Sequence, residues 1–225
     1  MRNPKQISGV AVLAILLAAT PASASSEPVV RNTRCSEFQF VASVPFTDAK
    51  GKPQTTNAFL WIPEKCRNIR GVVLAQQNVG EQGFAENAAI RQACRDTDMA
   101  MVWFYPYFDQ SFEHPDEDGA VLQKALDELA TVSGYAEIAS APWLPFGHSS
   151  TVSFAQQLAN WKPERCLAQI VFKGGTDFGL PNNRQVPLFE VAGNFTEWNQ
   201  QKKDWTKNAP NFWEPAAIGK DRATT

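Results

Sequence analysis

The segment Ala141-Pro-Trp-Leu-Pro-Phe-Gly-His-Ser-Ser-Thr-Val-Ser-Phe-Ala155 carries the strongest structural signal in this sequence. An apolar run ends at Gly147, Ser149 follows two residues later, and a helical pattern begins at once. This order predicts a strand, a sharp turn and a helix, with the serine hydroxyl held out of the turn. The alternative is a serine that only caps the helix, a role that would not need the glycine at position 147.

The rest of the chain alternates between strand and helix patterns. Apolar or alternating runs predict strands at residues 37–44, 58–62, 71–75, 99–104, 167–172 and 186–192. Helical periodicity covers residues 87–97, 117–133 and 150–160. The strand before the serine turn contains Pro142 and Pro145, so we expect it to be short or to bulge. Together these patterns indicate a mostly parallel sheet covered by helices on both faces.

The pentad Gly147-His148-Ser149-Ser150-Thr151 is similar to the Gly-x-Ser-x-Gly nucleophile elbow of α/β-hydrolases, with Thr151 in place of the last glycine. With Trp161-Lys-Pro-Glu-Arg165 and Phe172-Lys-Gly174, it resembles a group of exported bacterial α/β-hydrolases. The resemblance covers residues 57–198. It implies a three-layer α/β-hydrolase-like fold, a mostly parallel sheet with helices on both faces, and a short C-terminal part. Because the missing glycine normally allows close approach of helix and strand, threonine predicts a slightly wider elbow.

The same resemblance implies roles for several residues. Ser149 would attack an acyl carbonyl, and the backbone N–H of Ser150 would donate to the oxyanion. A second N–H would come from the loop at residues 76–80, from Gln77 or Asn78. The acid member of a triad is expected at Glu197, or alternatively at Asp177, although either could be an ordinary surface carboxylate. Gln77 and Asn78 could likewise belong to an ordinary polar turn.

The base is the difficulty, because the sequence contains only two histidines, His114 and His148. In the family the histidine follows the last strand, where this chain has Lys220. His148 lies inside the pentad, where a packing role is expected. His114 follows the fourth strand and is the remaining candidate, although an exposed loop histidine is the alternative. Three explanations stay open: a shortened chain, an inactive relative that binds a ligand, or a different base.

The function predicted from these residues is that of a serine hydrolase acting on carboxylic esters, weak or inactive for want of the catalytic histidine. The alternative is an inactive hydrolase-fold protein that binds a small ligand or sugar in the same cleft. Aromatic residues follow the fourth strand, at the sheet edge where ligands bind. Trp103, Tyr105 and Tyr107 are therefore candidates for substrate binding, with core packing as the alternative.

The first residues are typical of an export signal. Arg2 and Lys5 precede an apolar run at residues 10–19, which is too short to span a membrane, and Ala22-Ser-Ala24 offers a cleavage site. We expect a signal peptide at residues 1–24, a single domain at 25–225, and a periplasmic or secreted protein without stable membrane insertion. The net charge of −2 gives no reason to expect nucleic acid as a partner. The expected partner is a small ester or sugar ester.

Four cysteines in an exported chain permit disulfides, and three pairings are possible. We favour Cys35 with Cys66, because they flank the first two predicted strands, and expect buried thiols at Cys94 and Cys166. Neither the cysteines nor the two distant histidines have metal-site spacing. No Gly-x-Gly-x-x-Gly follows the first strand, so the sequence predicts no metal and no cofactor.

Overall fold

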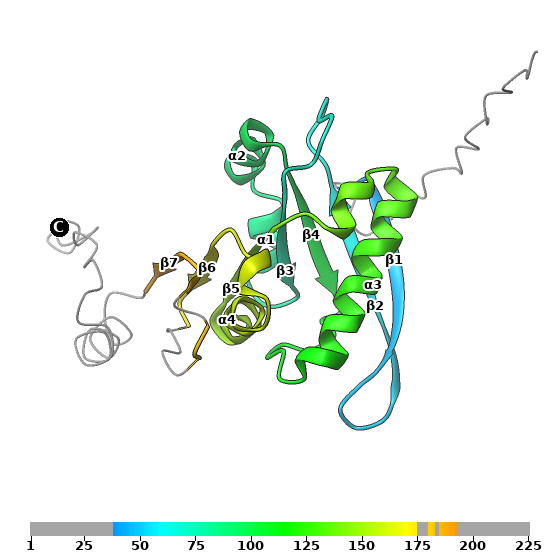
Figure 1. The fold of residues 1–225 in the computed structure, drawn as a ribbon, viewed down its shortest axis with the longest axis vertical. Coiled ribbons are helices and arrows are strands. Elements are labelled where there is room, and N and C mark those ends of the chain that lie inside the picture. Colours follow the sequence, from blue (N-terminus) through cyan, green and yellow to red (C-terminus); the bar gives the residue numbers. More distant parts are fainter. Residues whose placement is uncertain (1–37, 175–179, 183–184, 193–225) are drawn as a thin grey trace, which may run out of the picture.

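The computed structural model of the chain describes residues 38–174, 180–182 and 185–192. They form a seven-stranded sheet in the order β1-β2-β4-β3-β5-β6-β7 (Figure 1). The strands are β1 Phe40–Thr47, β2 Pro53–Trp61, β3 Gly71–Gln76, β4 Met99–Tyr105, β5 Trp143–His148, β6 Gln169–Phe172 and β7 Leu188–Val191. β2 pairs antiparallel with β1 and β4, and every other pairing is parallel.

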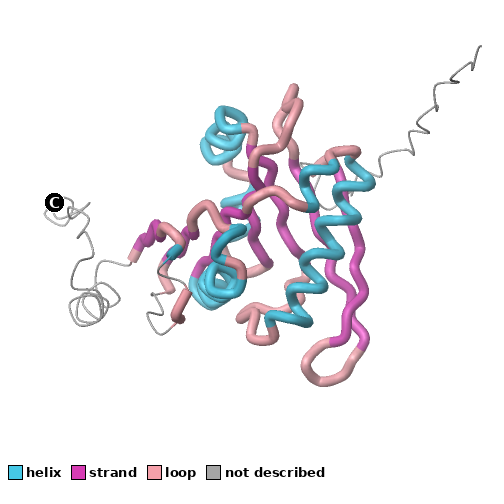
Figure 2. Tube along the Cα trace, viewed as in Figure 1, coloured by secondary structure: helices cyan, strands magenta, loops and turns pink. Residues whose placement is uncertain are grey.

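Helices cover both faces of this sheet, and Figure 2 shows them on either side of the strands. They are α1 Glu81–Ala85, α2 Ala88–Thr97, α3 Pro115–Ser133 and α4 Val152–Trp161, with the short 3-10 turns η1 Ala136–Ala139, η2 Ser149–Thr151 and η3 Pro163–Arg165. One core cluster contains the apolar stripe of α3, and a second contains buried side chains of α1 and α2. A small third cluster joins Val152 and Ala155 of α4 to Val171 of β6. The predicted three-layer, mostly parallel α/β architecture is therefore confirmed.

The central strands are apolar throughout because both of their faces are buried. On β4, Val102 and Phe104 belong to the cluster under α3, whereas Met101 and Trp103 belong to the cluster under α1 and α2. Successive side chains of a strand point to opposite faces, so a strand between two helical layers needs apolar residues at every position. The continuous apolar run at 99–104 fits this environment, because five of its six residues are buried.

Pro145 is tolerated in the middle of the sheet because β5 changes partner there. Residues 143–145 pair with β3, whereas residues 146–148 pair with β6. Proline cannot donate a hydrogen bond to a neighbouring strand, so a position where one ladder ends suits it. β5 has six residues, and its last three connect the N-terminal half of the sheet to β6 and β7.

Helix α1 is absent from the sequence-based prediction, because five residues are too few to show helical periodicity. The expected signal peptide at residues 1–24 and the short C-terminal part lie outside the described residues. Within the described part, no helix is long and apolar enough to cross a membrane.

The predicted disulfide between Cys35 and Cys66 is wrong, because Cys66 is a free thiol. It is buried in the loop between β2 and β3, where the hydroxyl of Tyr135 donates to its carbonyl at 2.8 Å. Cys94 is also free and buried, as expected, and burial raises the pKa of its thiol. Cys166 is also free, but it is half-buried and not fully buried as expected. Desolvation raises the pKa of its thiol to about 12. These thiols are therefore poor nucleophiles.

Gly119 lies where α3 packs against α4, directly under the ring of Trp161. Its substitution therefore measures how closely these two helices pack. A Cβ at this position would lie 2.5 Å from Trp161 Cζ2, so Gly119→Ala should force the ring or the helix to move. We expect a loss of about 1–3 kcal/mol, measured as a lower urea midpoint. Gly83→Ala is the matched control, because no heavy atom lies within 4 Å of its added Cβ and alanine favours a helix. Equal midpoints for the two variants would contradict the packing described.

Candidate active site at the turn between β5 and α4

Ser149 lies in an abrupt turn between a strand and a helix. β5 ends at His148, η2 follows, and α4 begins at Val152 (Figure 1). Ser149 has φ of +56°, a left-handed conformation that is uncommon for any residue other than glycine, and it is exposed. The predicted strand, turn and helix are therefore confirmed, and the serine is held out of the turn into solvent. We call residues 147–151 the elbow.

Two glycines make this turn possible. A Cβ at Gly147 would lie 2.6 Å from the carbonyl carbon of Thr151, and one at Gly174 would lie 2.6 Å from Ser149 O. Real Cβ atoms do not approach so closely, so the start of the helix rests directly on the backbone of β5 and of the segment after β6. The side chain of Thr151 is accommodated in the elbow by a hydrogen bond to the Glu81 carboxylate.

The loop after β3 reaches the elbow and carries the second predicted oxyanion donor. Asn78 Nδ2 donates to His148 O at 2.6 Å, which ties this loop to the residue before Ser149. The backbone N–H of Gln77 is engaged, because it donates to Phe104 O at 2.8 Å. The N–H of Asn78 has no acceptor within the described part. Of the two predicted residues, Asn78 is thus the one whose backbone N–H is free to bind a substrate oxygen.

Ser150 is the other residue expected to donate its backbone N–H to an oxyanion. It is the second residue of η2, and the first N–H groups of a helix have no partner inside it. Such groups favour an anion or a developing negative charge. The N–H groups of Ser150 and Asn78 therefore belong to two neighbouring segments. The hydrogen bond from Asn78 Nδ2 to His148 O connects these segments.

Neither histidine side chain forms a hydrogen bond with the Ser149 hydroxyl. The ring of His148 is half-buried against Gly80, where an added Cβ would lie 3.1 Å from Nδ1, and its centroid lies 5.3 Å from that of Phe172. His148 is thus a packing residue, as expected. His114 is exposed immediately before α3. Among the described residues, no hydrogen bond links the Ser149 hydroxyl to a side chain. Asp177 and Glu197 lie outside the described residues, as does Lys220.

The three aromatic candidates occupy different environments. Trp103 is only 3% exposed and packs against Phe38 and Phe59, with its centroid 5.5 Å from that of Phe59. It has no free surface for a substrate, so for this ring the core-packing alternative holds. Tyr105 and Tyr107 are 36% and 43% exposed at the end of β4 and just beyond it. They remain available to a ligand at the C-terminal edge of the sheet.

Sequence reasoning missed Glu81, the first residue of α1. Its side chain is fully buried, and its carboxylate contacts the elbow through His148 N and the Thr151 hydroxyl. A single glutamate in the polar run after β3 gives no periodicity or motif that would identify it. Its position becomes evident only when β3 and β5 are paired.

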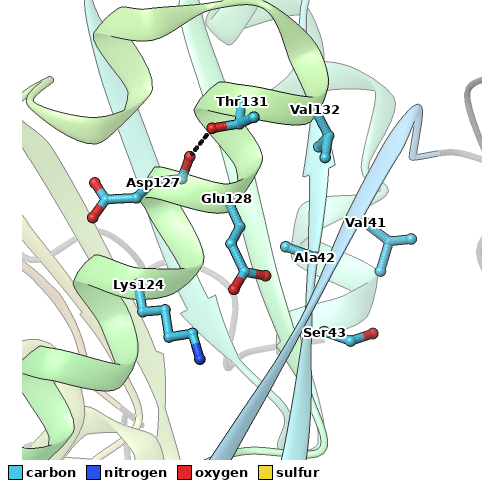
Figure 3. Close-up of a pocket in the computed structure, with 8 residues that line it drawn as sticks. All are labelled: Val41, Ala42, Ser43, Lys124, Asp127, Glu128, Thr131 and Val132. Atoms are coloured by element: carbon cyan, nitrogen blue, oxygen red, sulfur yellow. Dashed lines mark hydrogen bonds between the residues drawn. The ribbon is translucent and has the colours of Figure 1, made fainter. Parts of the chain in front are cut away.

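A pocket elsewhere on the molecule is separate from this site. It lies between β1 and α3 and is lined by Val41, Ala42, Ser43, Lys124, Asp127, Glu128, Thr131 and Val132 (Figure 3). Three strands separate β1 from β5 in the sheet, so the pocket does not include the elbow. No group of three or more histidine, cysteine or acidic side chains in the described residues could hold a metal ion.

The comparisons with known proteins are distant. No protein-family model matches the sequence, and no curated protein matches it. Among solved structures, similarity is found to an α/β serine hydrolase without a lid from Xanthomonas campestris, with 15% identity, a TM-score of 0.43 and coverage of 74% of this chain and 78% of that one. The poly(3-hydroxybutyrate) depolymerase LpqC from Bordetella parapertussis shows 17% identity, a TM-score of 0.43 and coverage of 68% and 65%.

A thermostable carboxyl esterase from Bacillus coagulans shows 15% identity and a TM-score of 0.36; the match covers 60% of this chain but only 45% of the esterase. At these TM-scores the likeness assigns no activity to the chain. The strand order, the parallel pairing and the serine turn after the fifth strand establish the α/β-hydrolase-like fold.

Asp118, near His114, gives the loop between β4 and α3 a pH dependence. Its Oδ2 accepts the N–H of His114 at 3.0 Å, and burial, assisted by Asp109, raises its pKa to about 6. This value lies above that of an unfolded aspartate, about 3.9. Protonated Asp118 therefore favours the folded state at low pH, and this contribution is lost as the pH rises through 6.

Asp118→Asn, which is uncharged at every pH, should therefore gain stability relative to the natural protein as the pH is raised from about 4 to about 7. Thermal unfolding midpoints at several pH values would measure the difference. Asp116→Asn, an exposed carboxylate in the same helical turn, controls for charge at the start of α3. A difference for Asp118→Asn that does not change with pH would contradict the burial effect.

Proposed function

We propose that the protein is a serine hydrolase of the carboxylic-ester type, with Ser149 as its nucleophile. The observation that carries the proposal is the left-handed conformation of an exposed serine between β5 and α4. Such strain is costly, about 1–3 kcal/mol, and is concentrated at functional sites. The helix-cap alternative does not account for it, because the cap positions of η2 and α4 are His148 and Thr151.

In the proposed reaction, Ser149 Oγ attacks the carbonyl carbon of an ester and gives its proton to a base. The N–H groups of Ser150 and Asn78 stabilise the oxyanion that forms. The leaving alcohol departs with a proton, and water then hydrolyses the acyl-serine to the acid and free enzyme. Tyr105 and Tyr107 are proposed to contact the substrate beside this centre. We also propose that the protein is exported, on the basis of its first 24 residues.

The identity of the base determines how fast this reaction can be. His114 remains the proposed base, and Glu197 or Asp177 the proposed acid member of the triad; among the described residues, no hydrogen bond joins His114 to Ser149. Loss of one member of a serine triad costs several orders of magnitude, while the oxyanion donors retain part of the acceleration. We therefore expect slow turnover of activated esters rather than efficient catalysis.

A second candidate function is ligand binding without chemistry, in the same place on the fold. It is favoured by the position of the two histidines, one packed against Gly80 and Phe172 and the other exposed before α3. In that case the elbow would hold a small ligand or sugar through the same N–H groups and tyrosines. The two functions differ in whether Ser149 forms a covalent bond.

A fluorophosphonate probe separates these functions, because it phosphonylates an activated serine. We expect intact-mass and peptide analysis to find one adduct on Ser149 of the natural protein and none on Ser149→Ala. Ser153→Ala is the matched control, because Ser153 is another exposed serine one turn further along and should not affect labelling. Hydrolysis of p-nitrophenyl acetate should be slow and should fall to background in Ser149→Ala.

Labelling of Ser149→Ala at the rate of the natural protein would remove Ser149 from the chemistry. An unlabelled natural protein after prolonged exposure would reject the hydrolase and leave the binding function.

A further inference from the structure

We propose that Glu81 is a positioning residue for the reaction at Ser149, which it supports through the backbone of His148 and the hydroxyl of Thr151. This inference rests on the proposed function of Ser149. Glu81 is fully buried at the start of α1, in a place where a carboxylate needs good hydrogen bonds to offset its lost hydration. Two of its three hydrogen bonds come from the elbow.

The carboxylate uses both oxygens. Oε1 accepts the N–H of His148 at 3.0 Å and the hydroxyl of Thr151, and Oε2 accepts the N–H of Gly80 at 3.0 Å. One oxygen therefore contacts both the residue before Ser149 and the residue two positions after it. Hydrogen bonds to ionised acceptors are among the stronger ones in proteins.

His148 is held on both sides of its backbone. Its N–H is bound by Glu81, and its carbonyl accepts from Asn78 Nδ2 at 2.6 Å. Both partners belong to the chain that follows β3, and α1 is fixed on β5 by Phe84, whose ring stacks on Phe146 with centroids 3.7 Å apart. The backbone of His148, next to the nucleophile, is thus hydrogen-bonded to the segment that contains Asn78, the proposed second oxyanion donor. An error of about 1 Å in such spacing can cost about 100-fold in rate.

The pair of Glu81 and Thr151 also accounts for the departure from the glycine motif. The Thr151 hydroxyl contacts the carboxylate and lies 3.0 Å from His148 N, and its side chain is fully buried. A glycine at position 151 would leave Glu81 Oε1 with one donor fewer. The threonine therefore adds a side-chain bond across the turn at the point where the α/β-hydrolase motif has none.

The geometry requires a carboxylate rather than an amide. Both Glu81 oxygens face N–H or O–H donors, and glutamine has only one oxygen. Whichever way the amide of Glu81→Gln is turned, its NH₂ faces at least one donor. A substitution that preserves size therefore still disrupts the arrangement.

Four variants test the role: Glu81→Gln, Thr151→Val, Thr151→Ser and the double variant Glu81→Gln/Thr151→Val. The readout is the second-order rate constant of fluorophosphonate labelling at Ser149. We expect a fall of about tenfold or more for Glu81→Gln and for Thr151→Val, which lose bonds across the turn. Thr151→Ser keeps the hydroxyl and should label at close to the natural rate. The double variant should lose less than the product of the two single losses, because the residues act together.

A general loss of stability is separated from positioning by two measurements. Gly119→Ala lowers stability through Trp161, at the end of α4 opposite to the elbow, and should label at the natural rate well below its unfolding midpoint. Steady-state hydrolysis of p-nitrophenyl acetate should show a lower kcat with KM little changed in Glu81→Gln. If Glu81→Gln does not fold, the comparison of Thr151→Val with Thr151→Ser decides the result.

The outcomes also distinguish this inference from the proposed function. If the natural protein is labelled and Glu81→Gln and Thr151→Val are labelled equally fast, the positioning role is overturned and the hydrolase remains. If the natural protein is not labelled, the hydrolase is rejected and amide hydrogen exchange at residues 147–152 decides. If amide exchange at these residues is about tenfold faster in Glu81→Gln and Thr151→Val than in the natural protein, and exchange in α3 is unchanged, the result supports Glu81 and Thr151 as residues that hold the turn in place. Unchanged exchange at those residues overturns it.

Discussion

The site depends on the direct contact between the backbone of β5 and the start of α4. At Gly147 there is no room for a side chain beside the carbonyl of Thr151, because the start of the helix lies directly against the strand. This geometry places Ser149 at a positive φ, a conformation that persists only where its surroundings impose it. The exposed hydroxyl is therefore a consequence of close packing and not of local preference.

The sheet order explains which residues can reach this turn. β3 and β5 are direct neighbours and run parallel, so the loops that follow them emerge at the same edge. β4 lies on the other side of β3, which brings Tyr105 and Tyr107 to the same end of the sheet. Ligands of parallel α/β sheets bind outside the carboxyl ends of the strands. The pairing therefore brings the serine, the proposed oxyanion donors and the tyrosines to one end of the sheet without requiring proximity in the sequence.

Much of this arrangement could be predicted from the sequence, because it follows from local patterns. The apolar run, Gly147 and the helical pattern after Ser149 predicted the turn, and alternating or apolar runs predicted the other strands. What failed depended on tertiary packing. Trp103 is buried because β4 is covered on both faces, and Cys66 is enclosed beside Tyr135 instead of being paired.

Glu81 illustrates the same limit within the site itself. Helix α1 is too short for a periodic signal, and the charge of its first residue would ordinarily predict an exposed side chain. Only the pairing of β3 with β5 brings that carboxylate under His148 and Thr151. The replacement of the motif's glycine by threonine is visible in the sequence, but its partner is not.

The most direct measurement of the central claim is a crystal structure of the protein after reaction with a fluorophosphonate. We expect the phosphorus to be bonded to Ser149 Oγ, with φ of Ser149 still positive. The phosphoryl oxygen should lie about 3 Å from the backbone nitrogens of both Ser150 and Asn78. A bound phosphonate whose oxygen points away from these two nitrogens, or a Ser149 inside a regular helix, would contradict the account.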